Sequence, residues 1–256
     1  MIARASPRGP YKKGREPPII PLLRKLERYG PISNSEKEFL THAIARVTEY
    51  EAGQSIVDKG AAPFDSCLVI EGFVGRVRLL PDGTRQIMAF HIPGDFCDLH
   101  SFVLKKMDHG IQALSRCRMA KVPHSKIHEI TERFPRLTRS LWWDVALDAA
   151  IHREWMISMG RRSAYEQMAH LYCEMLLRLR AVGLADDNTY DLPVTQQDLG
   201  DAFGLTSVHV NRTLQALKRG NLVISHGKRI TIPDIDALKK AAGFDPSYLE
   251  VRGDPA

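Results

Sequence analysis

The spacing of apolar residues changes twice along the chain, which divides it into a helical part, a strand-rich part and a second helical part. Over residues 19–47 the spacing is helical, with one helix expected at 19–29 and a second that begins with the capping box of Ser33 and Glu36. Over residues 50–122 the period falls to two, in short apolar runs separated by Gly, Pro and Asp. Many short strands at regular spacing predict a sandwich, barrel or jelly roll.

Helical spacing returns after residue 125, and the longest helix is expected from Pro135 to Met159. Two apolar stripes run along it, formed by Leu137, Leu141, Val145 and Ala149 and by Leu147, Ile151 and Trp155. A helix that is apolar on more than one side has more apolar surface than one domain covers. The pattern therefore indicates a helix that packs on its own domain and on a second copy of the chain, in a homodimer.

Two short helices further along the chain are spaced as in a helix-turn-helix. Thr195 caps the first helix, Gly204 marks a sharp turn, and the second helix is expected over residues 206–219. Two apolar runs, at residues 222–224 and 229–232, follow after this helix and predict a two-stranded wing. The segment between residues 185 and 193 is expected to be a loop. A plain helical hairpin is the alternative interpretation.

Polar side chains on the outward face of the second helix argue for DNA rather than for a plain hairpin. Arg212 can donate two hydrogen bonds to one guanine, and Asn211 can pair with adenine or with a phosphate. Backbone N–H groups at the start of the first helix are suited to hold a phosphate. The residues expected to contact DNA are Thr195, Gln196, Gln197, Ser207, Val208, His209, Asn211, Arg212, Lys218 and Lys228.

The charge distribution agrees with an anionic partner. The formal net charge is +6, and residues 205–230 carry Arg212, Lys218, Arg219, Lys228 and Arg229 without any acidic residue. No stretch approaches the roughly 20 apolar residues that span a bilayer, and no apolar run follows the first basic residues as it does in a secretory signal. We therefore expect a cytoplasmic protein that does not contact a membrane.

Four cysteines, Cys67, Cys97, Cys117 and Cys173, lie far apart and include no C-x-x-C pair, so free reduced thiols are expected. The sequence also contains no phosphate loop, no nucleophile–base arrangement and no recognisable metal-ligand spacing. These observations argue against an enzyme.

The stretch TQQDLGDAFGLTSVHVNRTLQALKRGNLV, followed by GKRITI, resembles the C-terminal domain of the CRP/FNR superfamily of bacterial transcription regulators. The stretch IEGFVGRVRLLPDGTRQIMAFHIPGDF and the long helix after it resemble the cyclic-nucleotide-binding-type β-roll and dimerisation helix of the same family. The resemblance spans about residues 20–235. It implies a homodimer that binds double-stranded DNA at palindromic operators, with RNA polymerase as a further partner. A β-roll regulatory module without DNA-binding activity is the alternative.

Together, the patterns and the resemblance predict an α+β fold with an N-terminal β-roll or jelly-roll sensor domain, a long dimerisation helix and a C-terminal winged helix-turn-helix. The expected divisions are a flexible basic arm at 1–18, the sensor domain at 19–134, the dimerisation helix at 135–160, the winged helix-turn-helix at 161–235 and a C-terminal extension at 236–256.

The chain departs from the cAMP-binding members of this family in the β-roll. Their Gly-Glu-Leu stretch, which holds the ribose, becomes Cys97-Asp98-Leu99, and their phosphate-binding Arg-Ser pair falls near Asp108 and His109. An aspartate in place of that arginine repels a phosphate, so cAMP and cGMP are not expected ligands. If an effector binds here, its pocket is expected to involve these five residues.

No cofactor is predicted. Iron–sulfur members of the family use an N-terminal cysteine cluster, and no cysteine precedes Cys67. The β-roll does gather side chains that can bind a metal or haem, namely His91, Cys97, Asp98, His100 and His109. Their spacing matches no closed metal site, so histidines hydrogen-bonded within the protein are the favoured interpretation.

Val208 stands where members that read GTGA- or TTGAT-type half-sites have a glutamate, so the operator sequence of those members cannot be transferred to this chain.

Overall fold

The computed structural model describes residues 7–8 and 19–249, and these form two compact units. The described residues of the first unit are 7–8, 19–78 and 89–146, and those of the second are 79–88 and 147–249. The long helix α5 (Pro135–Arg161) contributes its first half to one unit and its second half to the other. Within the described ranges, no helix is both long enough and apolar enough to span a membrane.

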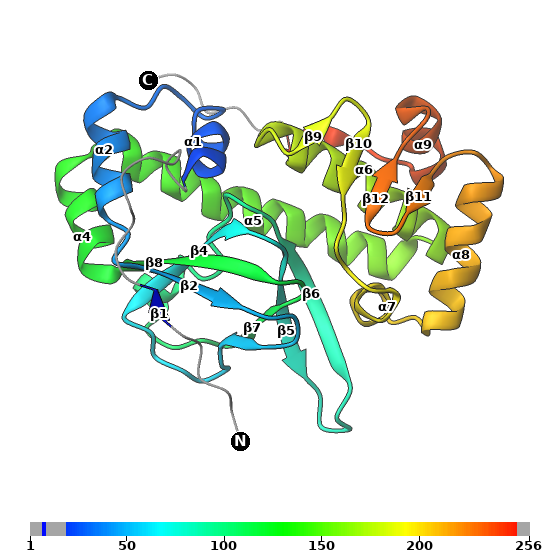
Figure 1. Cartoon of the computed structure of the whole chain (residues 1–256), viewed down its shortest axis with the longest axis horizontal. Helices are drawn as coiled ribbons and strands as arrows, with labels where there is room; N and C mark the ends of the chain where they lie inside the picture. Colours follow the sequence, from blue (N-terminus) through cyan, green and yellow to red (C-terminus); the bar gives the residue numbers. More distant parts are fainter. Residues whose placement is uncertain (1–6, 9–18, 250–256) are drawn as a thin grey trace. The chain divides into compact units, whose positions relative to one another are not determined.

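Two four-stranded sheets supply the strands of the first unit, although residues 85–88 of β6 fall in the second (Figure 1). One sheet has the order β1-β2-β8-β4, from the strands Pro7–Arg8, Arg46–Tyr50, Cys117–Pro123 and Asp65–Glu71. The other has the order β3-β7-β5-β6, from Ser55–Val57, Gly110–Ala113, Val74–Leu79 and Arg85–His91. Non-consecutive strands are neighbours in both sheets, which confirms the predicted jelly-roll type of β domain.

Side-chain alternation along β4 explains why this strand is apolar on both faces. Cys67 and Val69 lie in a core cluster that also contains residues of β3, β5, β7 and β8, and that cluster fills the space between the sheets. Leu68 and Ile70 point to the other face, into a second cluster formed with helices. Those helices are α1 (Ile20–Leu26), α2 (Asn34–His42), α4 (His124–Arg133) and the first half of α5.

One buried lysine joins three parts of the first unit. Lys25 of α1 forms an ion pair with Asp95, at 2.5 Å between Nζ and Oδ1, and a second ion pair with Asp144 of α5. Burial alone would lower the pKa of Lys25, but the two carboxylates raise it above the ordinary value, so the side chain stays charged. The two ion pairs thus hold α1 against the turn that contains Asp95 and against helix α5.

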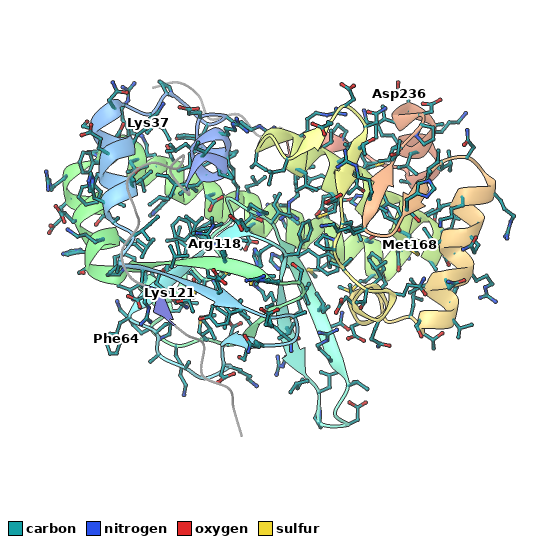
Figure 2. The ribbon with its side chains drawn as sticks, in the orientation of Figure 1. Lys37, Phe64, Arg118, Lys121, Met168 and Asp236 are labelled. Carbon is teal, nitrogen blue, oxygen red and sulfur yellow. The ribbon has the colours of Figure 1, made fainter. Side chains whose placement is uncertain are left out.

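The second unit combines helices with a small sheet. Helix α6 (Ala164–Ala181) contacts α8 (Ser207–Arg219) and α9 (Ile235–Ala242), and Met168 of α6, labelled in Figure 2, is fully buried. The second unit also contains α7 (Gln196–Phe203) and the 3₁₀ turn η1 (Pro246–Leu249), whereas the short helix α3 (Ser101–Leu104) belongs to the first unit. The sheet has the order β11-β12-β10-β9, from Ile224–His226, Arg229–Thr231, Thr189–Asp191 and Ala185–Asp186.

Several expected boundaries differ from the structure. The segment expected as a loop at 185–193 contains β9 and β10, which pair with the wing and enlarge it to four strands. Helix α5 continues through Gly160 to Arg161, past its expected end at Met159. Val47, expected on a helix, lies in β2. Most of the predicted arm at 1–18 lies outside the described residues, although Pro7 and Arg8 pair with β2.

The expected C-terminal extension at 236–256 includes part of helix α9. Leu238 and Ala242 of this helix are buried, and α9 has extensive contacts with α6. The N-cap of α9 is Asp234, whose carboxylate accepts hydrogen bonds from the amides of Asp236 and Ala237. In the structure this segment up to Leu249 therefore belongs to the second unit.

Candidate nucleic-acid interface

Helix α7, the first helix of the helix-turn-helix, begins at the predicted capping box. The Thr195 hydroxyl accepts a hydrogen bond from the Asp198 amide at 3.0 Å, and the Asp198 carboxylate accepts one from the Thr195 amide at 2.9 Å. The Thr195 amide is thus engaged inside the capping box. The neighbouring Gln196 and Gln197 are exposed.

Two glycines set the turn that follows α7. Gly204 has φ +68°, in the left-handed region that glycine adopts without strain, as the sequence predicts. The sequence pattern alone does not identify Gly200 as a residue that this turn requires. A Cβ atom at Gly200 would lie 2.5 Å from the Leu205 carbonyl oxygen, so only glycine lets the turn fold back this closely. A glycine inside a helical pattern is the signal that points to such a close approach.

Helix α8 turns a polar face outward. Thr206 caps the helix by accepting a hydrogen bond from the His209 amide at 3.2 Å. The apolar face consists of Val210, Thr213 and Leu217, all buried at helical spacing. The opposite face is exposed and contains Ser207, Val208, Asn211, Arg212 and Gln215, while His209 is half-buried. The structure thus brings the predicted base-reading residues together on one surface.

The cations of α8 and of the wing differ in their surroundings. In the described part of the chain, Arg212 and Lys218 have no ion-pair partner. Lys228 of the wing lies 3.4 Å from an Asp191 carboxylate oxygen, and Arg229 also pairs with Asp191, at 3.6 Å. The positive charge of α8 is therefore available to an anion, whereas that of the wing is partly neutralised.

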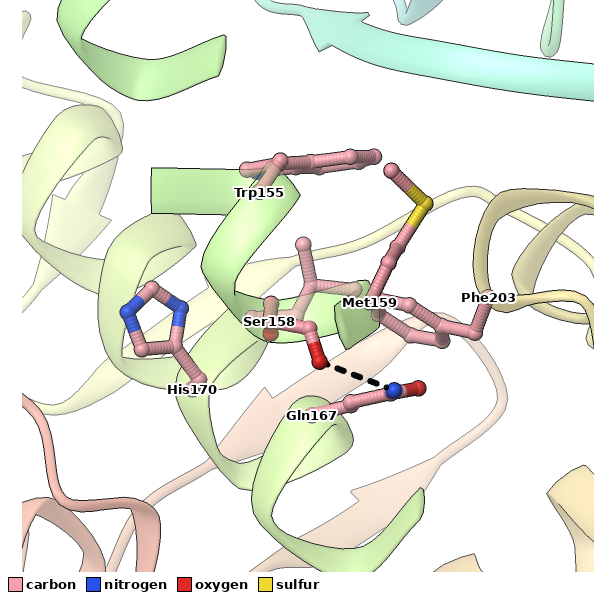
Figure 3. A pocket seen from close by; sticks show the side chains of 7 residues that line it. Trp155, Ser158, Met159, Gln167, His170 and Phe203 are labelled. Carbon is pink, nitrogen blue, oxygen red and sulfur yellow. Dashed lines mark hydrogen bonds between the residues drawn. The ribbon is translucent and has the colours of Figure 1, made fainter. Parts of the chain in front are cut away.

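The helix-turn-helix is anchored to the end of α5 around a small pocket (Figure 3). Gln167 of α6 donates hydrogen bonds to the carbonyl oxygens of Ser158 and Arg162, at 3.0 and 3.1 Å. The ring of Phe203, at the end of α7, lies 6.1 Å from that of Trp155 between centroids. These contacts bind α6 and α7 to the second half of α5, so α8 projects from a supported base.

The residues predicted for an effector pocket do not share one environment. Cys97 and Asp98 are fully buried, and the Asp98 carboxylate accepts a hydrogen bond from the Cys67 amide at 2.6 Å. Cys97 packs between the sheets, whereas Leu99 belongs to the cluster under the helices. Asp108 and His109 are in direct contact, at 2.7 Å between Oδ1 and Nδ1.

Comparison with known proteins agrees with both units. The family model of the cyclic nucleotide-binding domain matches residues 47–134, and that of the Crp-like helix-turn-helix domain matches residues 172–241. The nitrogen fixation regulation protein FixK of Bradyrhizobium diazoefficiens is 34% identical over 190 residues, which cover 72% of this chain and 77% of FixK. The chain belongs to the CRP/FNR family.

Other members of the CRP/FNR family extend the match. The transcriptional activator protein FnrL of Cereibacter sphaeroides is 29% identical over 218 residues, covering 83% of this chain and 86% of FnrL. The structure of FixK2 from Bradyrhizobium japonicum superposes with a TM-score of 0.70 at 26% identity, covering 78% of this chain and 98% of FixK2. The chain is thus a DNA-binding transcription regulator of the CRP/FNR type, and its named relatives are regulators rather than enzymes.

Proposed function

We propose that this CRP/FNR regulator binds an inverted-repeat operator as a homodimer, with α8 of each copy in the major groove. The observation that carries the proposal is the exposed face of α8, where Ser207, Asn211 and Arg212 lie in the N-terminal half of the helix. Side chains at this end of a recognition helix reach base edges. Arg212 supplies a guanidinium fork that fits one guanine edge.

A stripe on α5 supports the homodimer. Its members are Trp142, Val145, Ala149, His152, Met156 and Met159, at alternating intervals of three and four residues. Trp142 is 77% exposed and Met156 68% exposed, although both are large and apolar. The 3–4 spacing is that of a coiled-coil seam, which two identical helices bury symmetrically. A second copy of this helix is therefore the occupant that fits the stripe.

The proposed homodimer acts in the cytoplasm and contacts RNA polymerase when it is bound to its operator. Membership of a family of transcription regulators supports both points. In this proposal the β-roll adjusts DNA binding in response to a chemical signal. Asp108 is the accessible part of the predicted effector region, because its side chain is 77% exposed, whereas the neighbouring His109 is buried.

Selection of bound sites from genomic DNA tests the proposal. We expect recovered sites to contain an inverted repeat whose half-site centres lie about one helical turn, roughly 34 Å, apart. Binding should weaken steeply as salt rises, because cations on the protein release counterions from phosphates. Recovery of single half-sites, or of DNA without a common sequence, would contradict a dimer that reads bases.

A further inference from the structure

Two histidines and an aspartate from different segments meet beside strand β7 of the first unit. His100 is the N-cap residue of helix α3, and Asp108 and His109 directly precede β7. One nitrogen or oxygen atom that can ligate a metal, taken from each of the three side chains, lies within 4.8 Å of the other two. The rings of His100 and His109 are 5.2 Å apart between centroids. The fold therefore collects a set of ligands that are not regularly spaced in the sequence.

His109 supplies an independent sign of a ligand. Its side chain is only 6% exposed, and Nδ1 contacts the Asp108 carboxylate at 2.7 Å. The other ring nitrogen, Nε2, is buried and has no hydrogen-bond partner among the described residues. Leaving a buried polar atom unpaired is costly, so the His109 ring gains from an ion or a water molecule that supplies the missing partner.

The charge around the cluster limits which cation fits. The Arg76 guanidinium is buried close by and donates a hydrogen bond to the Cys97 carbonyl oxygen at 3.1 Å, so it repels a weakly held cation. Mg²⁺ and Ca²⁺ prefer all-oxygen sites, whereas imidazole nitrogen suits zinc and similar transition metals. Only a cation that gains strongly from two nitrogen ligands offsets this repulsion.

We propose that His100, Asp108 and His109 form a site for a borderline divalent transition metal, of which Zn²⁺ is the probe of choice. Three protein ligands leave a coordination position open, as in zinc sites that also hold water or a small molecule. The exposed Asp108 gives access from solvent, and a bound ion would join the start of α3 to the start of β7. The site rests on side chains of the first unit alone and does not depend on the proposed mode of DNA binding.

Calorimetry of the full-length chain with Zn²⁺, after removal of metals with a chelator, tests the site. We expect one tightly bound Zn²⁺ ion per chain. Asp108→Asn should raise its dissociation constant by at least about tenfold, because the charge of the ligand is lost while its shape is kept. His100→Ala should abolish the tight binding. The matched control is His128→Ala. His128 lies 3.2 Å from Glu132 in an exposed pair that offers only two ligands. This change should leave the tight binding of Zn²⁺ intact.

Two further measurements separate loss of the site from loss of the fold. Zn²⁺ should raise the thermal unfolding midpoint of the wild type and of His128→Ala, and raise that of Asp108→Asn by less at the same Zn²⁺ concentration, while the metal-free midpoints of all three agree. Co²⁺ should give visible d–d absorption in the wild type that Asp108→Asn changes. Equal Zn²⁺ affinity in the wild type, Asp108→Asn and His100→Ala would overturn the proposal, even if DNA binding proceeds as described above.

Discussion

At the scale of single residues, Arg212 is the side chain on which base reading should depend most. It is exposed on α8 and makes no ion pair within the described residues. Arg212→Ala should cost about 1–3 kcal/mol on the selected operator and relax the preference at one base step, because the bidentate contact with guanine is lost. Fluorescence anisotropy with the operator and with single-base variants of it measures both effects.

Lys218→Ala is the matched control for Arg212→Ala, because Lys218 lies in the last turn of the same helix. If Lys218 contacts phosphate, its loss should weaken binding to all sequences alike and reduce the salt dependence. Equal weakening of specific and nonspecific DNA by Arg212→Ala would instead make Arg212 a backbone contact. Base reading would then rest on Ser207, Val208, His209 and Asn211.

At the scale of elements, helix α5 has two apolar faces with different roles. Leu141, which the sequence pattern placed on the candidate dimer stripe, is 5% exposed and packs with Leu137 in the core of the first unit. The neighbouring Trp142 is exposed and lies on the 3–4 stripe. Leu141→Glu would therefore disrupt the fold and does not test the dimer, whereas a change at Trp142 does.

Trp142→Glu should separate the dimer. Two symmetric charges placed in an apolar seam should raise the dimer dissociation constant by about 100-fold or more, measured by sedimentation velocity. Phe64→Glu is the control, since Phe64 is 86% exposed, aromatic and remote from α5 in sequence (Figure 2). A Trp142→Glu protein that sediments like the wild type would place the interface elsewhere.

At the scale of the whole molecule, the packing of the β-roll argues against a cyclic nucleotide as the signal. Asp98 and Cys97 are fully buried, and the Asp98 carboxylate is engaged by the Cys67 amide at 2.6 Å. Asp108, where the family resemblance places the phosphate contact, carries the same sign of charge as the phosphate. We expect cAMP and cGMP to bind more weakly than about 1 mM in calorimetry and to leave DNA affinity unchanged. A low-micromolar dissociation constant for either nucleotide would refute this.

The sequence by itself determined the order and kind of the main elements. The caps at Ser33 and Thr195 lie where the sequence predicts them, because a capping box depends on residues three positions apart. The alternation in β4 and the exposed face of α8 follow from strand and helix periods, which are also local. Both halves of the family resemblance rest on such local patterns, and for this reason the family was predictable from the sequence.

Only the tertiary structure decided which residues meet across long distances in the chain. Pairing of β10 with β12 turned an expected loop into part of the wing sheet, because backbone hydrogen bonds between distant segments leave no local pattern. Packing against the β-roll decided that Leu141 faces the core and Trp142 faces outward, since both lie in an apolar stretch of one helix. The path of the chain from α3 to β7 likewise brought the ring of His100 to 5.2 Å from that of His109 between centroids, although the spacing of the two residues matches no metal-ligand pattern.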